Sequence, residues 1–222
     1  MRGRFITVEG PDGSGKTTAA RHLAEWLRGR GVETVLTAEP GGTPLGEEVR
    51  RLLLHLRDVS DALDPRADAL LFAAARAQHT ARLILPSLER GAWVVCARYA
   101  DSSLAYQGHG YGNDLDELRR LQRFATYETR PDLTLLLDVS VEVGLRRKRH
   151  GEWNRFEDTE GAAFFELVRA GYLRLAAEEP DRFRIIDGSG SVAEADALVR
   201  EAVEPLLTSD GDGIGLADRA GR

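Results

Sequence analysis

The stretch "GPDGSGKTT", residues 10–18, decides the fold of this chain. It satisfies the pattern G-x-x-x-x-G-K-S/T of a phosphate-binding loop, the P-loop. The apolar run "FITVE" stands before it, and residues 15–28 continue with apolar positions at helical spacing. In such a loop, glycines let successive backbone N–H groups turn toward one phosphate, and the helix N-terminus adds a favourable dipole. The stretch therefore predicts a strand, a loop and a helix in that order, with ATP or GTP bound at the loop.

Two side chains of this loop take part directly in the expected chemistry. Lys16 places a positive charge on the β- and γ-phosphates, and the Thr17 hydroxyl is a ligand for Mg²⁺. Gly13 occupies the third variable position, so the loop supplies no arginine of its own. The residues expected to bind ATP are Gly10, Pro11, Asp12, Gly13, Ser14, Gly15, Lys16, Thr17 and Thr18.

Motifs of other P-loop classes are absent from the sequence. It has no guanine-reading N-K-x-D and no ABC-type signature, and 222 residues are too few for a large mechanical ATPase. A small phosphotransferase remains. Such an enzyme needs an acceptor, residues that hold it, and a cover that keeps water from the γ-phosphoryl group.

Composition places the chain among ordinary soluble proteins, with 42% hydrophobic and 30% charged residues. The net charge of −6 argues against binding nucleic acid through general electrostatics. The single cysteine, Cys96, lies in an apolar run, which fits a reducing compartment. The sequence has neither the apolar core of a signal peptide nor an 18-residue apolar run, so we expect a cytoplasmic protein without a membrane span.

Short β-rich runs alternate with longer helical patterns, which indicates a parallel sheet with crossover helices. The expected strands lie near Phe5–Glu9, Val32–Ala38, Trp93–Ala97, Leu133–Asp138 and Phe183–Asp187. The expected helices cover residues 15–28, 45–56, 64–89, 114–128, 141–149, 159–178 and 192–207, and Pro86 is expected to kink the third or end it early. These elements predict one doubly wound α/β domain, residues 1–207. Residues 208–222, rich in glycine and aspartate, are expected to form a flexible tail.

Three stretches are candidates for holding an acceptor. In "AEPGGTPLGEEVRRLL", residues 38–53, a turn with Glu39 and Pro40 follows a strand, at the sheet edge where open α/β sheets bind ligands. In "LLFAAARAQH", residues 70–79, Phe72 and Arg76 share one side of a helix and suit a planar base with a carbonyl edge. Phe72 alone is better explained as a core residue, whereas an unpaired Arg76 in an apolar helix would be costly.

The third stretch is "CARYADSSLAYQG", residues 96–108, a buried strand end and then a loop that opens a short helix. Arg98 comes directly off the strand tip, where it can bind an acceptor phosphate. An ion pair at the sheet edge is an equally good explanation of Arg98.

A basic segment, "GLRRKRHGEWNRFE", residues 144–157, is a candidate for the cover. It carries Arg146, Arg147, Lys148, Arg149 and Arg155 in a chain that is acidic overall. We interpret it as a lid whose arginines close over ATP and neutralise charge on the transferring phosphoryl group. A solvated, charged helix end is the alternative.

Four segments together resemble a known family. "VEGPDGSGKTT", "EPGGT", "RYADSSLAYQG" and "RPDLTLLLDV" are similar, in order and spacing, to segments of bacterial thymidylate kinases, over residues 4 to about 207. The resemblance implies a P-loop nucleoside monophosphate kinase fold with strand order 2-3-1-4-5. It also implies transfer of phosphate from ATP to dTMP with Mg²⁺, giving dTDP, in a homodimer. The long helices 65–89 and 114–128 are candidates for the dimer interface.

The resemblance also implies roles in the acceptor pocket. It places the thymine-stacking ring on Phe72 and the thymine-reading guanidinium on Arg76. Ser103 falls where a polar side chain contacts the base. Tyr106 falls where a ring packs under the deoxyribose and disfavours a 2′-hydroxyl, and Gln107 follows in the same wall.

The phosphate groups have expected partners as well. The resemblance implies that Arg98 and Arg50 bind the dTMP phosphate, and Ser102 belongs to the same substrate-binding set. The acids nearest the transferred group are Glu9 and Asp12, which could also hold Mg²⁺ through water. In the lid, Arg149 and Arg155 are the expected catalytic arginines.

The chain departs from the family pattern at two positions. The family usually has Asp-Arg where this chain has Ala97-Arg98, and Asp-Arg-x-Glu where this chain has Asn154-Arg155-Phe156-Glu157. Each change removes a negative charge near the phosphates. Our hypothesis is that Glu9, Asp12 or ordered water replaces the acid expected at position 97.

Two alternatives to a dTMP kinase stay open. One is a kinase of another pyrimidine (deoxy)nucleoside monophosphate, or of a deoxynucleoside; Arg98 and Arg50 favour a monophosphate, and Tyr106 favours a deoxyribose. The other, suggested by Ala97, is a nucleotide-binding protein that has lost catalysis, which the complete P-loop and basic lid disfavour.

Overall fold

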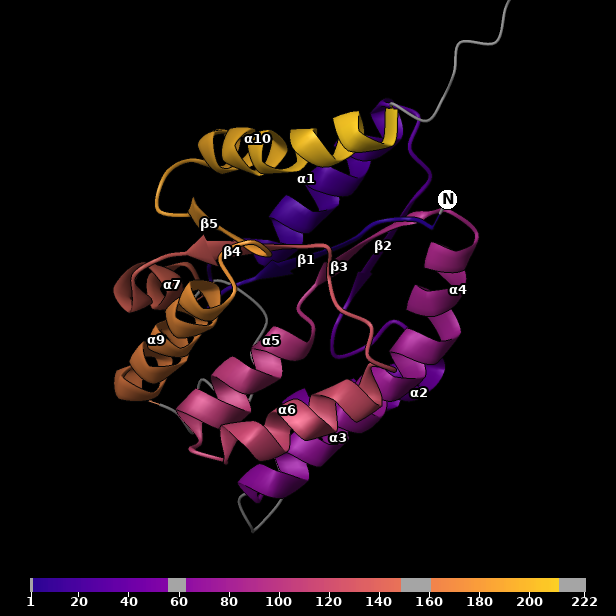
Figure 1. Ribbon diagram of the computed structural model, residues 1–222. Helices are drawn as coiled ribbons and strands as arrows, with labels where there is room; N and C mark the ends of the chain where they lie inside the picture. Colours follow the sequence, from indigo (N-terminus) through magenta and orange to yellow (C-terminus); the bar gives the residue numbers. More distant parts are fainter. Residues whose placement is uncertain (1, 56–62, 149–160, 212–222) are drawn as a thin grey trace, which may run out of the picture.

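The computed structural model describes residues 2–55, 63–148 and 161–211 (Figure 1). Its centre is a five-stranded parallel sheet with the strand order β2-β3-β1-β4-β5, which confirms the expected topology. The strands are β1 (Phe5–Glu9), β2 (Thr34–Ala38), β3 (Trp93–Ala97), β4 (Leu133–Asp138) and β5 (Phe183–Asp187). Every residue of β1 and β3 is buried, because helices cover both faces of the sheet.

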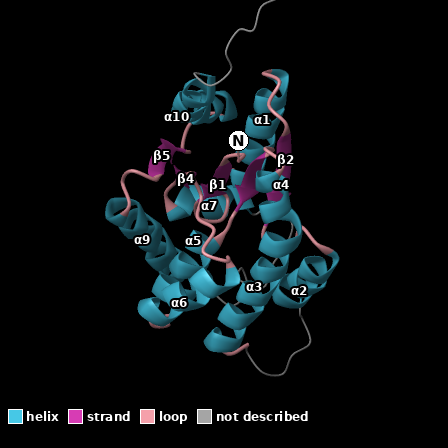
Figure 2. Cartoon of the chain, turned by 45° about the vertical axis from the view of Figure 1, so that its right-hand side comes forward, coloured by secondary structure: helices cyan, strands magenta, loops and turns pink. Residues whose placement is uncertain are grey.

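The helices form a layer on each face of this sheet (Figures 1 and 2). One layer holds α1 (Lys16–Gly29) and α10 (Val192–Gly211). The other layer holds α4 (Leu85–Glu89), α5 (Ala100–Ser103), α6 (Leu115–Ala125) and α9 (Ala162–Glu178). Outside this second layer, α3 (Pro65–His79) packs between α2 (Pro44–His55) and α6, while α7 (Val141–Lys148) follows β4.

The N-terminal end of α3 begins as predicted. The Asp64 carboxylate accepts hydrogen bonds from the backbone N–H of Arg66 at 2.8 Å and of Ala67 at 3.3 Å. Pro86 does not end this helix, because a π-helical segment, Thr80–Ile84, precedes the proline and α4 continues to Glu89. A second π-helical segment, Leu104–Gly110, continues α5 along the short helix expected there.

Several predicted boundaries were wrong, two of them for clear local reasons. The second strand begins at Thr34 rather than Val32, because the Val32 N–H donates to the Leu27 carbonyl and closes the end of α1. Helix α10 runs to Gly211, four residues into the predicted tail, since adding turns to an existing helix costs little. No helix in the described ranges is long and apolar enough to cross a membrane.

Candidate active site

A cleft of about 1080 Å³ opens at the carboxyl ends of the strands, between the P-loop and α3. It brings together most of the residues that the sequence singled out. Those that line it are Asp12, Gly13, Gly15, Lys16, Thr17, Thr18, Glu39, Pro40, Arg50, Phe72, Arg76, Ala97, Arg98, Ser102, Tyr106 and Gln107. Glu9 and Ser103 lie behind this wall, at 0% and 1% exposure.

The P-loop has the backbone that its glycines predict. Gly10, Gly13 and Gly15 all have positive φ, at 141°, 76° and 94°. The Lys16 ammonium donates to the Pro11 carbonyl at 2.7 Å, across the loop. Burial and the nearby charge of Arg98 lower the pKa of Lys16 to about 7. A bound triphosphate would reverse this shift, because opposite charge stabilises the ammonium.

Arg98 forms an ion pair, which was one of the two explanations for it, and it also lies in the cleft wall. Its guanidinium lines the cleft and forms an ion pair with Asp12 of the P-loop. It also donates to the Tyr106 hydroxyl at 3.1 Å and to the Ser102 hydroxyl at 3.2 Å. Burial opposes ionisation of Asp12, but the charges of Arg98, Lys16 and Lys148 outweigh it and hold the Asp12 pKa at about 2. The P-loop and the residue that follows β3 are thus joined by a charged contact.

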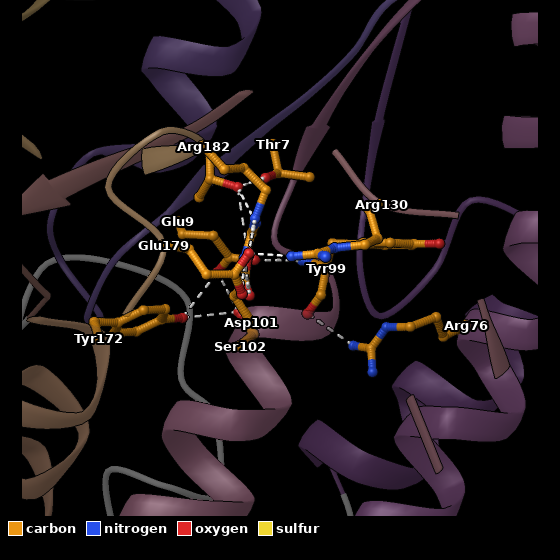
Figure 3. Close-up of polar contacts among 11 residues, drawn as sticks. Thr7, Glu9, Arg76, Tyr99, Asp101, Ser102, Arg130, Tyr172, Glu179 and Arg182 are labelled. Atoms are coloured by element: carbon orange, nitrogen blue, oxygen red, sulfur yellow. Dashed lines mark hydrogen bonds and ion pairs between the residues drawn. The ribbon is translucent and has the colours of Figure 1, made fainter. Parts of the chain in front are cut away.

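Arg76 is buried, at 1% exposure, and its charge is compensated. Its guanidinium pairs with Glu39 at 2.7 Å and donates to the Ser103 hydroxyl at 2.9 Å. It also donates to the Tyr99 carbonyl at 3.0 Å (Figure 3) and to the Gln122 side chain. These bonds use four of the five N–H groups of the arginine and fix its plane at the cleft wall.

Three more candidate substrate residues are fixed by their neighbours. Arg50 donates to the Pro40 carbonyl at 2.9 Å, and Gln107 donates to the buried Asp68 carboxylate at 2.9 Å. Phe72 is half-buried and packs against the core cluster around Tyr106, so it is both a wall of the cleft and part of the core.

The Glu9 side chain lies on the opposite face of the sheet from the side chain at position 97. Val8 is paired with Ala97 across the β1–β3 ladder, and both belong to the core cluster beneath α1. Successive side chains of a strand point to opposite faces, so Glu9 points away from Ala97. Its carboxylate contacts the Tyr99 N–H and the hydroxyls of Ser102 and Tyr172. The geometry therefore favours Asp12 over Glu9 for any acidic role at the phosphates.

The basic segment is described only in part. Arg147 donates to the carbonyls of Gly188, Ser189 and Gly190, which anchors α7 to the loop after β5. Arg147 and Lys148 both line the cleft. Arg149 and Arg155, the predicted catalytic arginines, lie outside the described residues.

The sequence did not point to several residues that support the site. Tyr172 of α9 reaches Glu9 and Ser102, and Arg182 forms a two-point ion pair with Asp101 of α5, at 2.7 and 2.9 Å (Figure 3). His79 and Gln122 bind Glu39 and Arg76, respectively. The sequence could have indicated Asp101, because an acid so soon after Arg98 is a candidate for an ion pair. It could not have indicated Tyr172, because a tyrosine at a core position of a helix is an ordinary packing residue.

Comparison with known proteins agrees with this geometry. A family model described as Thymidylate kinase matches residues 8–199. Curated thymidylate kinases of Pseudomonas fluorescens strain SBW25 and Ectopseudomonas mendocina strain ymp are 48% and 46% identical, covering 93% of this chain and 96% and 98% of their own. A crystal structure of thymidylate kinase from Ehrlichia chaffeensis matches with a TM-score of 0.73 and 34% identity, covering 93% of this chain and 99% of that one. The chain belongs to the thymidylate kinase family.

Proposed function

We infer that this protein transfers the γ-phosphoryl group of ATP to dTMP, giving ADP and dTDP. Apart from family membership, one observation supports this inference: Lys16 of the P-loop and Arg98 of the proposed acceptor side line the same cleft. Because the acceptor phosphate is already an anion, the reaction needs no strong general base. Holding both phosphates in line and neutralising their charge is then the main task of the protein.

The pocket residues have proposed roles. Phe72 stacks on thymine, and Arg76 offers its fifth N–H to a thymine carbonyl, since the bonds among the described residues use the other four. Arg98 and Arg50 hold the dTMP phosphate, and the Tyr106 ring excludes a 2′-hydroxyl. We propose that Arg149 and Arg155 supply further positive charge from the lid.

The residues at the P-loop fit a Mg²⁺ ion. Thr17 is exposed on the first turn of α1 and lines the cleft with Asp12. Mg²⁺ takes one or two protein ligands, several waters and substrate phosphate oxygens, so a protein cage is not required. In agreement, no group of three acidic, His or Cys side chains able to hold a metal occurs in the described ranges. We propose that Thr17 and Asp12 would hold the ion, whose charge would offset the negative charge of ATP.

The function is tested by ADP formation from ATP with dTMP, dUMP, UMP or thymidine as the acceptor. The expected order has dTMP first and thymidine last, because Arg98 and Arg50 need a phosphate to bind. A higher rate with UMP or thymidine would instead support another pyrimidine kinase. Absence of dTMP-dependent ADP would support the impaired nucleotide-binding protein.

We further propose a homodimer that forms through α3 and α6. Phe124 of α6 and Tyr127, which follows the end of that helix, are 85% and 59% exposed, and Ala77 of α3 lines the same surface hollow. Exposed aromatic rings in one patch are typical of protein interfaces. Sedimentation of the wild type and of Phe124→Asp tests this, since a dimer through this patch predicts that the variant sediments as a monomer.

Two broader proposals concern the whole chain. Residues 1–207 form a single folding unit that includes the lid, so thermal unfolding should show one transition. The buried Cys96 thiol is compatible with a reducing cytoplasm, and fractionation of cells would locate the protein.

A further inference from the structure

Arg98 has a backbone conformation that must be held in place. Its φ is 70°, in the left-handed region that is strained for a non-glycine residue. The Arg98 N–H donates to the Val8 carbonyl at 3.0 Å, and the Cys96 thiol donates to the Arg98 carbonyl at 3.0 Å. The next N–H, that of Tyr99, donates to the Glu9 carboxylate at 2.7 Å. Strained residues of this kind persist when their surroundings determine them from several sides.

Glu9 reaches the Arg98 side chain through two hydroxyl groups. Its second carboxylate oxygen accepts from the Ser102 hydroxyl at 2.6 Å and from the Tyr172 hydroxyl at 2.9 Å (Figure 3). These two hydroxyls are 2.8 Å apart. Arg98 in turn donates one guanidinium nitrogen, Nη1, to Ser102 at 3.2 Å and to Tyr172 at 3.3 Å.

Above the Glu9 pKa of about 7, where its carboxylate is ionised, the direction of these hydrogen bonds is fixed by the two charged ends. An ionised carboxylate only accepts and a guanidinium only donates. Each hydroxyl has one hydrogen, which must run toward Glu9, either directly or from Tyr172 through Ser102. Both oxygens then present lone pairs to Arg98, so no donor faces another donor.

We propose that Glu9 and Tyr172 are positioning residues for the acceptor phosphate, acting through Arg98. Glu9 fixes the backbone that follows Arg98, and the Glu9–Ser102–Tyr172 relay orients the Arg98 guanidinium at the cleft. The proposal rests on the proposed function, because the phosphate it positions is that of dTMP. This role of Glu9 differs from the metal or phosphoryl contact that the sequence suggested. Through Tyr172, helix α9 also becomes part of the acceptor site.

Burying a carboxylate carries an unfavourable desolvation free energy. Glu9 has no exposed surface, and an ionised group away from water is tolerated only when hydrogen bonds or opposite charge compensate it. A merely structural partner for the Tyr99 N–H would not need a charge. The negative charge draws the hydrogens of both hydroxyls toward Glu9, which leaves their lone pairs for Arg98. This explains why an acid stands at this position.

The test compares Glu9→Gln with Tyr172→Phe. Glutamine keeps the shape of Glu9, but its amide N–H₂ group would face groups that donate to Glu9 in the wild type. The Arg98 guanidinium would then be misoriented, so KM for dTMP should rise at least tenfold. Tyr172→Phe removes one acceptor for Arg98 and should raise the same KM about fivefold. KM for ATP should change less than threefold in both, and the double variant should show less than the product of the two effects, because both act through one network.

Tyr111→Phe is the matched control, since Tyr111 packs on Phe164 of the same α9 helix, at 4.8 Å between ring centroids. Unchanged KM for dTMP in Glu9→Gln, or equal rises in KM for dTMP and ATP, would overturn the relay. If Glu9→Gln does not fold, the KM values of Tyr172→Phe alone test the relay, and an unchanged KM for dTMP in that variant would overturn it. Failure of the proposed function is distinguishable, because the wild type itself would then form no dTMP-dependent ADP.

Discussion

Gly13 and Gly144 meet backbone to backbone. A Cβ atom at Gly13 would lie 2.0 Å from the Gly144 carbonyl oxygen, and one at Gly144 would lie 2.5 Å from the Asp12 carbonyl oxygen. The P-loop is therefore seated directly on α7, the helix that leads into the basic segment. This contact also explains why the third variable position of the loop carries no arginine: any side chain there would displace α7.

Gly13→Ala should lower kcat/KM for ATP at least tenfold. The new methyl group would meet backbone atoms that cannot rotate away, and alanine at a φ of 76° is strained as well. Steady-state kinetics with varied ATP measures the effect. Gly29→Ala is the control, because a Cβ at Gly29, the last residue of α1, would meet no atom within 4 Å apart from its chain neighbours and its own helix backbone. Equal activity in both variants would show that the P-loop and α7 are not tightly packed.

Ala97→Asp should reduce the Mg²⁺ concentration needed for half-maximal rate about threefold or more. Position 97 lines the cleft, and the Glu9 side chain points to the other face of the sheet, so an aspartate at position 97 would add a carboxylate on the cleft side. Ala97→Asn is the matched control, because it adds the same volume without the charge. If Asp and Asn give the same Mg²⁺ dependence, Asp12 or water already fulfils this role.

The strands show what the sequence could predict. Trp93–Ala97 and Leu133–Asp138 were predicted to the residue, because both consist mostly of apolar residues, as is typical of strands covered on both faces. The order of the strands came from the family resemblance, since alternating elements do not specify which strands are neighbours. Val32 was assigned wrongly because its side chain fits a strand, while its N–H closes a helix.

Site residues that belong to a sequence motif could be predicted, whereas contacts between distant parts of the chain could not. Lys16 belongs to the P-loop motif and Arg98 directly follows the end of β3, so their place at the cleft was foreseen. The pairing of Arg98 with Asp12, and the reach of Tyr172 into the same site, join residues 74 or more positions apart. Such contacts depend on how the helices pack, which local patterns do not contain.

Ionisation of Glu9 should make the protein less stable. Burial, and then the neighbouring charge of Asp101, raise the Glu9 pKa from 4.5 to about 7, although Arg98 and the hydroxyls of Ser102 and Tyr172 oppose this rise. The unfolded chain therefore releases this proton at lower pH than the folded protein does, and stability falls as pH increases from about 4.5 to 7. Urea unfolding of the wild type and Glu9→Gln at pH 5 and pH 8 measures it. The wild type should lose stability relative to the variant at pH 8, and a difference that is constant with pH would contradict the assignment.

Arg149→Ala and Arg155→Ala should each lower kcat at least tenfold, because arginines at a transferring phosphoryl group act on the transition state more than on substrate binding. Arg146→Ala is the control, since Arg146 is exposed on α7. Single-turnover rates with saturating ATP and dTMP separate chemistry from product release. An unchanged kcat in both variants would show that the basic segment is a charged helix end and not a catalytic lid.

Tyr106 should discriminate between sugars through its ring and not through its hydroxyl. The ring lies in the cleft wall and packs edge-on against Phe164 and Tyr172, while the hydroxyl is bonded to Asp12 and Arg98. Tyr106→Phe keeps the ring, so the preference for dUMP over UMP should stay within about twofold even if both rates fall. Tyr106→Ala opens space beneath the ribose and should reduce that preference at least fivefold. These two acceptors differ only at the 2′ position, so the ratio of their kcat/KM values isolates the contact. A loss of preference in Tyr106→Phe would assign the discrimination to the hydroxyl and its bonds with Asp12 and Arg98.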